Sequence, residues 1–252
     1  MESSLPSFIP LLALTFLIAL VYSSVGHGGA SGYLALLALY SFPKEPASAS
    51  ALCLNLFVSG TAFLAFWRAA HFSWRLAWPF VLTSLPAAFF GGLIKISPSF
   101  YSLLLGWVLL FAGFRLLIDL KPIAEKVYSG PSLLFSLPLG ALIGLLSGIV
   151  GVGGGIFLSP ILLFFHWADP KRTAATSAFF ILVNSLAGLL GRAFRYQFRF
   201  DLSSLVIGMV ATAFLGGILG SHLGANHFSA RWLRRILGAV LFIATFKLFR
   251  SL

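Results

Sequence analysis

Charged residues are scarce in this sequence, and acidic residues are the scarcest. Charged side chains make up 9% of the 252 residues, with six Asp and Glu against 17 Lys and Arg. A soluble globular domain has about 25% charged and about 45–50% apolar residues. This chain is 59% hydrophobic, with a mean hydropathy of +1.00. The composition excludes an ordinary water-soluble protein and predicts an integral membrane protein.

Several chemistries are excluded by missing residues. The single cysteine, Cys53, permits neither an intramolecular disulfide nor a CxxC metal site. The sequence contains no HExxH, no GxGxxG and no Walker motif, and its acidic residues lie at segment ends or in loops. Its basic residues form short clusters between apolar runs, as beside a membrane. We therefore expect no catalytic residues, no cofactor, no metal site and no nucleic-acid partner.

Long hydrophobic runs fill most of the chain, in two series separated by the polar stretch "DLKPIAEKVYSGPS". Spanning a bilayer takes about 20 helical residues, and continuous runs are typical of helices rather than of a β-barrel. We predict an all-α polytopic membrane protein with about six to ten transmembrane helices. The runs occupy residues 5–25, 30–42, 48–67, 76–94 and 100–118, then 131–150, 155–167, 174–191, 202–221 and 233–249.

The two series carry the same landmarks in the same order. "VGHGGASGYL" from Val25 matches "VGVGGGIFLS" from Val150, "FPKEPASASA" matches "DPKRTAATSA", and "LGWVLLFAGFRLL" from Leu105 matches "LGAVLFIATFKLF" from Leu237. A shared apolar bias would align Leu with Leu, but it would not align ordered Gly, Pro-Lys, Ser and basic positions. We therefore predict two homologous transmembrane repeats, 1–118 and 132–252, joined by a linker at 119–131.

Each repeat contains a glycine cluster between apolar runs. An unpaired amide in hydrocarbon costs several kcal/mol, so a helix breaks there only where protein, water or a ligand binds the freed groups. Glycine brings bare N–H groups close to a ligand, and the following helix directs its positive end at the same spot. Matching breaks are typical of binding segments in secondary transporters. The pattern predicts an anion site between glycine-broken or re-entrant segments; close helix packing is the alternative role for the glycines.

The two glycine segments, with "PKEPASASA" and "DPKRTAATSAFFILVNS" after them, resemble the paired signatures of the TauE/SafE family of membrane permeases over nearly the whole chain. The second signature, "GIVGVGGGIFLSPILL", is the more specific. The first departs from it at His27 and Ala30 and resembles a subgroup with the form "VGHGGASGY". The resemblance implies about eight transmembrane helices. It also implies transport of sulfite, thiosulfate or small organosulfonates across the cytoplasmic (inner) membrane of a prokaryote.

The expected substrate-binding residues are the glycines of the two breaks and nearby polar side chains. His27 is a candidate donor or proton-coupling group, because an imidazole changes charge near neutral pH; the alternative is a histidine satisfied by a backbone carbonyl. Ser177 and Asn184 share one helical face, whereas most hydroxyls in membrane helices bond to their own backbone. The full set is Ser24, Gly26, His27, Gly28, Gly29, Ser31, Asn55, Gly151, Gly153, Gly154, Gly155, Thr176, Ser177 and Asn184.

Two arrangements of the repeats remain open at this stage. Four crossings in each half would make the repeats parallel, whereas three or five would make them inverted, and the distribution of Lys and Arg favours neither. Pro10 and Pro138 shorten the helices ahead of the glycines, which favours re-entrant hairpins and inversion. We expect five basic side chains to be interfacial anchors rather than an entry funnel for anions: Arg68, Arg75, Arg192, Arg195 and Arg199.

The sequence thus predicts a permease that moves a small anion by alternating access around the glycine breaks. Its expected partners are that anion, the lipid bilayer, a coupling ion such as H+ or Na+, and further copies of the chain in a homo-oligomer. An anion channel and a transporter of an unrelated small solute are the alternatives. A structural role is a more distant alternative. An intramembrane enzyme is also distant, because no acid pair lies within an apolar run.

Overall fold

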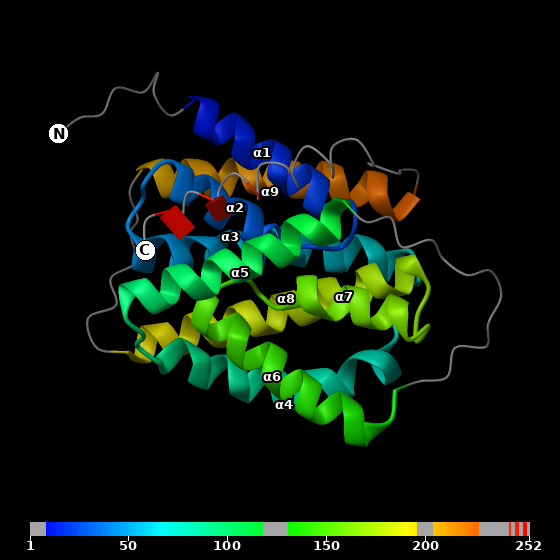
Figure 1. Ribbon diagram of the computed structural model, residues 1–252. Coiled ribbons are helices and arrows are strands. Elements are labelled where there is room, and N and C mark those ends of the chain that lie inside the picture. Colours follow the sequence, from blue (N-terminus) through cyan, green and yellow to red (C-terminus); the bar gives the residue numbers. More distant parts are fainter. Residues whose placement is uncertain are drawn as a thin grey trace.

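The computed structural model describes residues 9–117, 131–195 and 204–226, with five positions between 242 and 250. In these ranges the chain forms nine helices and no strand (Figure 1). The predicted linker and the last apolar run, 233–249, lie almost entirely outside the described residues. The helices are α1 (Ile9–Ser23), α2 (Ala30–Leu39), α3 (Lys44–Arg68), α4 (Trp74–Leu93), α5 (Pro98–Leu117), α6 (Leu133–Val150), α7 (Gly155–Phe164), α8 (Pro170–Phe194) and α9 (Ser204–Asn226).

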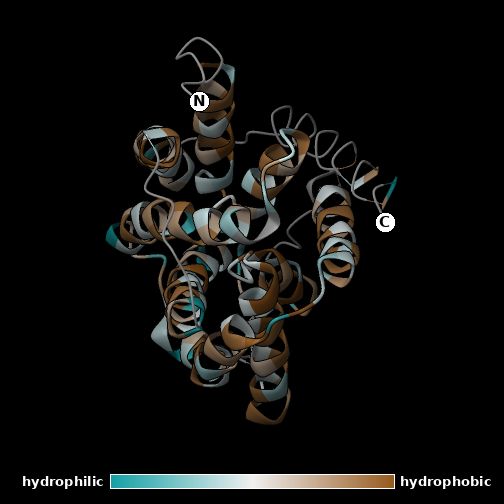
Figure 2. Ribbon diagram, turned by 90° about the vertical axis from the view of Figure 1, so that its left-hand side faces the viewer, coloured by the Kyte–Doolittle hydropathy of each residue, from teal (hydrophilic) through white to brown (hydrophobic). Residues whose placement is uncertain are grey.

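Five of the described helices, α3, α4, α6, α8 and α9, are long and apolar enough to cross a membrane by length and composition. Hydrophobic residues extend along the helices (Figure 2). Many large apolar side chains face outward; Leu82 and Phe90 of α4 and Phe114 of α5 are each 60% exposed. Exposed apolar surface of this extent is unfavourable in water and favourable against lipid. The expected class, an all-helical integral membrane protein, is confirmed.

Glycines bring two pairs of helices into close contact. A Cβ added at these glycines would overlap a backbone carbonyl of the partner helix, so a larger residue would force the helices apart. The contacts advance in the same order along both helices of a pair, so α9 runs parallel to α1, and α6 parallel to α4. The glycines are Gly216, Gly220 and Gly224 of α9, against Phe16, Leu20 and Ser24, and Gly140, Gly144 and Gly148 of α6, against Phe80, Ser84 and Ala88.

Helices α3 and α8 lie between these two pairs (Figure 1). They run antiparallel, because Phe66 near the end of α3 packs with Ala174 near the start of α8. Helix α9 packs beside α3, and Phe214 contacts Phe57 with ring centroids 6.2 Å apart, while α4 packs beside α8. The bundle therefore contains α1, α3 and α9 in one direction and α4, α6 and α8 in the other.

The two short helices fold back on the helices that precede them. Gly32 of α2 lies against Ile18 and Tyr22 of α1, and Phe135 at the start of α6 contacts Phe165 after α7, with ring centroids 5.5 Å apart. Both hairpins turn at the predicted glycine clusters, where the backbone takes positive φ values that a side chain would strain. These glycines are Gly26 and Gly29 in the first hairpin and Gly151, Gly153 and Gly154 in the second.

We expect Gly144→Ala to destabilise the protein, because the added Cβ would overlap the Ser84 carbonyl of α4. Overpacking of this kind typically costs about 1–3 kcal/mol. The control is Gly60→Ala in α3, where the nearest atom, Leu182 Cδ1, is 3.8 Å from the new Cβ. Thermal unfolding in detergent should show a lower midpoint for Gly144→Ala alone; equal midpoints would mean that α4 and α6 do not need this approach.

Candidate functional site

The side chain of Asn55, fully buried on α3, connects the tips of the two hairpins. Its Oδ1 accepts a hydrogen bond from the backbone N–H of Ala30, the first residue of α2, at 3.0 Å. Its Nδ2 donates to the carbonyl of Val152, in the second tip, and to Ser185 Oγ, both at 3.3 Å. One amide group therefore binds backbone from both glycine clusters.

Glycines are required on both sides of Asn55. A Cβ on Gly28 would overlap Asn55 Oδ1, and a Cβ on Gly153 would lie 2.6 Å from Asn55 Nδ2. Across from Asn55, the side chain of Ile181 on α8 approaches the same two glycines, with Cγ2 at 3.1 Å from the Gly28 position and 2.8 Å from the Gly153 position. The two central helices thus hold the tips beside each other.

The carbonyls at the end of α6 receive hydrogen bonds from several helices. Arg192 of α8 donates to Gly148 and Ile149, at 2.9 and 2.8 Å. Ser48 of α3 and Tyr101 of α5 donate to Val150, at 2.8 and 3.1 Å. A helix that ends inside the protein leaves carbonyls that need donors. Arg192 is only 6% exposed, so the expectation that it anchors the protein at the membrane interface is wrong.

His27 links the first tip to α7. One ring nitrogen, Nδ1, donates to the Val25 carbonyl at 3.0 Å, and the other, Nε2, lies 2.8 Å from Ser159 Oγ. Ser159 lies 3.0 Å from Ser177 Oγ on α8 and 2.6 Å from the carbonyl of Gly155. His27 is therefore bonded to a backbone carbonyl, as the simpler interpretation of this residue expects. It also joins the first hairpin to the second through its hydrogen bond with Ser159.

Backbone amides at both tips lack a hydrogen-bond acceptor within the described part of the chain. They are buried, and they lie at or just before the N-termini of α2 and α7, whose N-caps are Gly29 and Gly154. A helix N-terminus with open N–H groups attracts negative charge. The amides belong to Gly28, Gly29, Gly153, Gly154 and Gly155.

The other polar residues of the expected set have different surroundings. Three are bonded locally: Ser24 donates to Val21 at 2.7 Å, Ser31 lies 2.9 Å from Tyr22 Oη, and Asn184 donates to Phe180 at 2.8 Å. Gly26 and Gly151 form the turns, against Ala174 and Ser48. Thr176 Oγ1 and Asn184 Oδ1 are buried without a hydrogen-bond partner in the described chain. Sequence reasoning missed Ser48, Tyr101, Ser159 and Ser185, which are joined to the tips by contacts distant in the chain.

Apolar helices around a buried polar site, where two interrupted helices meet, define a polytopic membrane protein of the transporter class. The family described as sulfite exporter TauE/SafE matches residues 11–248. The chain belongs to this family, and it is a membrane transporter of the TauE/SafE type.

Relatives are described as transporters too. The chain is 35% identical over 236 residues to the probable membrane transporter protein y4hK of Sinorhizobium fredii. The aligned residues make up 92% of this chain and 94% of that protein. A probable membrane transporter protein of Xylella fastidiosa is 33% identical over 94 residues, or 37% of this chain and 35% of that protein. No solved structure matches the chain.

We expect Asn55→Leu to loosen both tips, because it leaves the Ala30 amide and the Val152 carbonyl without their partner. A buried polar group left unsatisfied costs about 1–3 kcal/mol. Hydrogen–deuterium exchange should become faster in peptides covering 24–33 and 150–156, and the melting temperature should fall. The matched control, Asn184→Leu, removes one bond to the carbonyl of its own helix and should leave exchange at both tips unchanged. The same acceleration in both variants would contradict the role of Asn55.

Proposed function

We propose that the chain transports a small anion, a sulfur oxyanion such as sulfite or thiosulfate or an organosulfonate, bound between the two hairpin tips. The observation that carries this proposal is the set of buried glycine amides at both tips that have no acceptor among the described residues. N–H groups that donate to an anion form shorter and stronger hydrogen bonds than neutral pairs. The family description, sulfite exporter, supports the sulfur chemistry of the substrate.

Charge at the site supports an anion over a cation. Of the two acidic residues in the described ranges, Glu45 belongs to the first turn of α3, and Asp169 is the N-cap of α8, where it accepts hydrogen bonds from the amides of that helix. The nearest cation in the bonding network is Arg192, which donates to the last turn of α6, just before Gly151. A buried guanidinium stays charged, and its field favours an anion.

We propose further that the chain consists of two inverted repeats, joined by the linker at 119–131. The "GG" pairs at 91–92 and 216–217 support this. Gly91 of α4 packs on α6 and Gly92 on α8, whereas Gly216 of α9 packs on α1 and Gly217 on α3. Each pair thus packs on the first helix and on the long central helix of the other half of the chain. The corresponding helices, α1 and α6, α3 and α8, and α4 and α9, also run in opposite directions.

Alternating access then requires the tips to separate from Asn55 or from each other. The contact between His27 and Ser159 joins the two hairpins, so a conformational change there opens one side of the site. The Ser159 hydroxyl carries one proton, and it can donate to His27 Nε2, to the Gly155 carbonyl or to Ser177 Oγ. When the imidazole is protonated, its Nε2–H donates a hydrogen bond to Ser159 Oγ, and the Ser159 hydroxyl then donates to the Gly155 carbonyl or to Ser177 Oγ. This exchange makes H+ a better candidate for coupling than Na+.

The substrate is tested by thermal shift with sulfite, thiosulfate, sulfate, taurine and chloride, followed by uptake into liposomes. A ligand at about 100 times its Kd stabilises the native state by about 2.7 kcal/mol. We expect a sulfur anion to raise the melting temperature of the wild type and of Gly60→Ala and to enter liposomes with both. Gly153→Ala, which crowds Asn55 and Ser185, should show neither effect while remaining folded.

The same assay separates a carrier from a channel. A carrier saturates and exchanges labelled for unlabelled anion, whereas a channel passes current without saturation at low substrate. If no sulfur anion binds the wild type, the anion proposal is wrong, and cations and neutral solutes become the candidates.

We expect His27→Gln to uncouple transport from protons. Glutamine keeps a hydrogen-bonding side chain beside Ser159, but its amide does not take up a proton near neutral pH. Uptake driven by a pH gradient should fall to the equilibrium level, while exchange of labelled anion at uniform pH persists. Ser31→Ala, which changes a contact to Tyr22 only, is the control. If His27→Gln keeps gradient-driven accumulation, proton coupling through His27 is disproved.

A further inference from the structure

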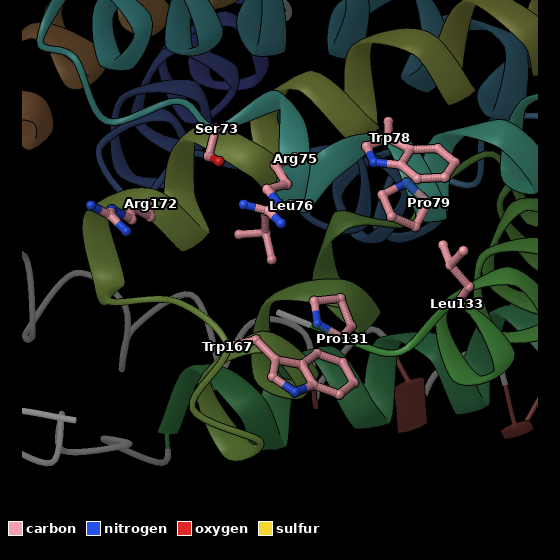
Figure 3. Close-up of a pocket in the computed structure, with 9 residues that line it drawn as sticks. All are labelled: Ser73, Arg75, Leu76, Trp78, Pro79, Pro131, Leu133, Trp167 and Arg172. Atoms are coloured by element: carbon pink, nitrogen blue, oxygen red, sulfur yellow. The ribbon is translucent and has the colours of Figure 1, made fainter. Parts of the chain in front are cut away.

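A cavity of about 560 Å³ lies at one end of the bundle, apart from the hairpin tips. Helices α4, α6 and α8 begin there, and α7 ends there. Figure 3 shows Trp78 and Trp167 on opposite walls, Arg75 and Leu76 between them, and Arg172 at one end. Ser73, the N-cap of α4, also lines the cavity. Arg75, which we expected to anchor the protein at the membrane interface, lines this cavity.

The described charged side chains at the cavity carry a net positive charge. Arg75 and Arg172 line it, and the N-cap side chain of Ser73 makes no capping bond to the first amides of α4. The nearby acid, Asp169, accepts hydrogen bonds from the amides of Lys171 and Arg172, both at 2.9 Å, and pairs with Arg172 Nε at 3.4 Å. One carboxylate thus offsets one of the two guanidinium groups, and the positive end of α4 adds to the remaining charge.

An apolar cluster separates this cavity from the second hairpin tip. Leu76, 7% exposed, forms part of the cavity wall and packs in one cluster with Phe80, Leu158 and Phe180. At the far side of the cluster, the ring of Phe180 lies 2.8 Å from the position of a Cβ on Gly154. An anion that moved from the cavity to the tips would have to pass these side chains, so the cluster closes the path in this conformation.

We propose that this cavity is a vestibule that binds small oxyanions and delivers them to the hairpin tips when the apolar cluster opens. The proposal rests on the anion transport proposed above and adds a second binding site on the path. The two arginines supply charge-assisted donors for oxyanions, and clefts lined by one sign of charge raise the local concentration of the opposite ion by about 10-fold or more.

The test measures local potential and binding in the cavity without transport. In a Cys53→Ala background, Ser73→Cys is labelled in phospholipid-free detergent by an anionic and by a cationic methanethiosulfonate reagent. We expect Arg75→Gln with Arg172→Gln to lower the ratio of anionic to cationic labelling rates about fivefold or more. Sulfate, which does not react with the reagents, should slow the labelling saturably in the presence of both arginines only. Arg195→Gln, at the opposite end of α8, is the control and should change neither quantity.

Three results would overturn the vestibule: an unchanged labelling ratio in the double variant, no protection by sulfate, or protection that requires added anionic phospholipid, which would make the ligand a lipid headgroup. If transport depends on Gly153 but none of the labelling effects is seen, the vestibule is rejected and the proposed function stands. Saturable sulfate protection at Ser73→Cys without anion transport by the wild type rejects the proposed function and keeps the cavity as an anion site.

Discussion

A helix that ends inside a bilayer leaves backbone groups with no water to bind them, and this constraint organises the whole structure. Among the described helices, α1 and α6 end in the interior, and each turns back through a glycine cluster. At the end of α6, side chains from three other helices, α3, α5 and α8, donate hydrogen bonds to the free carbonyls. The polar side chains in an otherwise apolar bundle are therefore concentrated where the chain turns, and the fold and the site have one common cause.

Carbonyls and amides are treated differently at the tips. The carbonyls of Gly148, Ile149, Val150 and Val152 all receive side-chain donors, whereas the glycine amides that follow have no acceptor in the described chain. Stability alone would favour satisfying both kinds of group, since either costs about 1–3 kcal/mol when buried and unpaired. The carbonyls of Gly28, Gly151 and Gly153 have no donor among the described residues either, but the open amides lie at helix N-termini, where the helix dipole favours an acceptor-rich, negatively charged solute.

The sequence predicted the membrane class and the two glycine breaks, because hydropathy and glycine spacing are local signals. It could not separate Asn55 from Asn184, since both are amides on matching apolar helices. In the structure Asn55 faces the tips, and Asn184 bonds to its own helix. Ser159 and Arg192 were missed for the same reason: their partners, His27 and the end of α6, lie far away in the chain. Which face of a helix meets which neighbour depends on packing, and packing is not encoded in periodicity alone.

The tight glycine contacts also limit how the molecule can move. Helix α9 belongs to the second series of segments but packs, without room for a Cβ, against α1 of the first, and α6 packs in the same way against α4. Packed interfaces this close resist sliding, because small shifts bring backbone atoms into overlap. Helix α8 packs on α4 just as closely, since a Cβ on Gly191 would overlap the Phe89 carbonyl. The units that can move as bodies are therefore not the sequence halves but two sets, α1 with α9, and α4 with α6 and α8. Helix α3 lies between them, and the hydrogen bonds of Asn55, His27 and Ser48 to the second hairpin are among the contacts that such a movement would break.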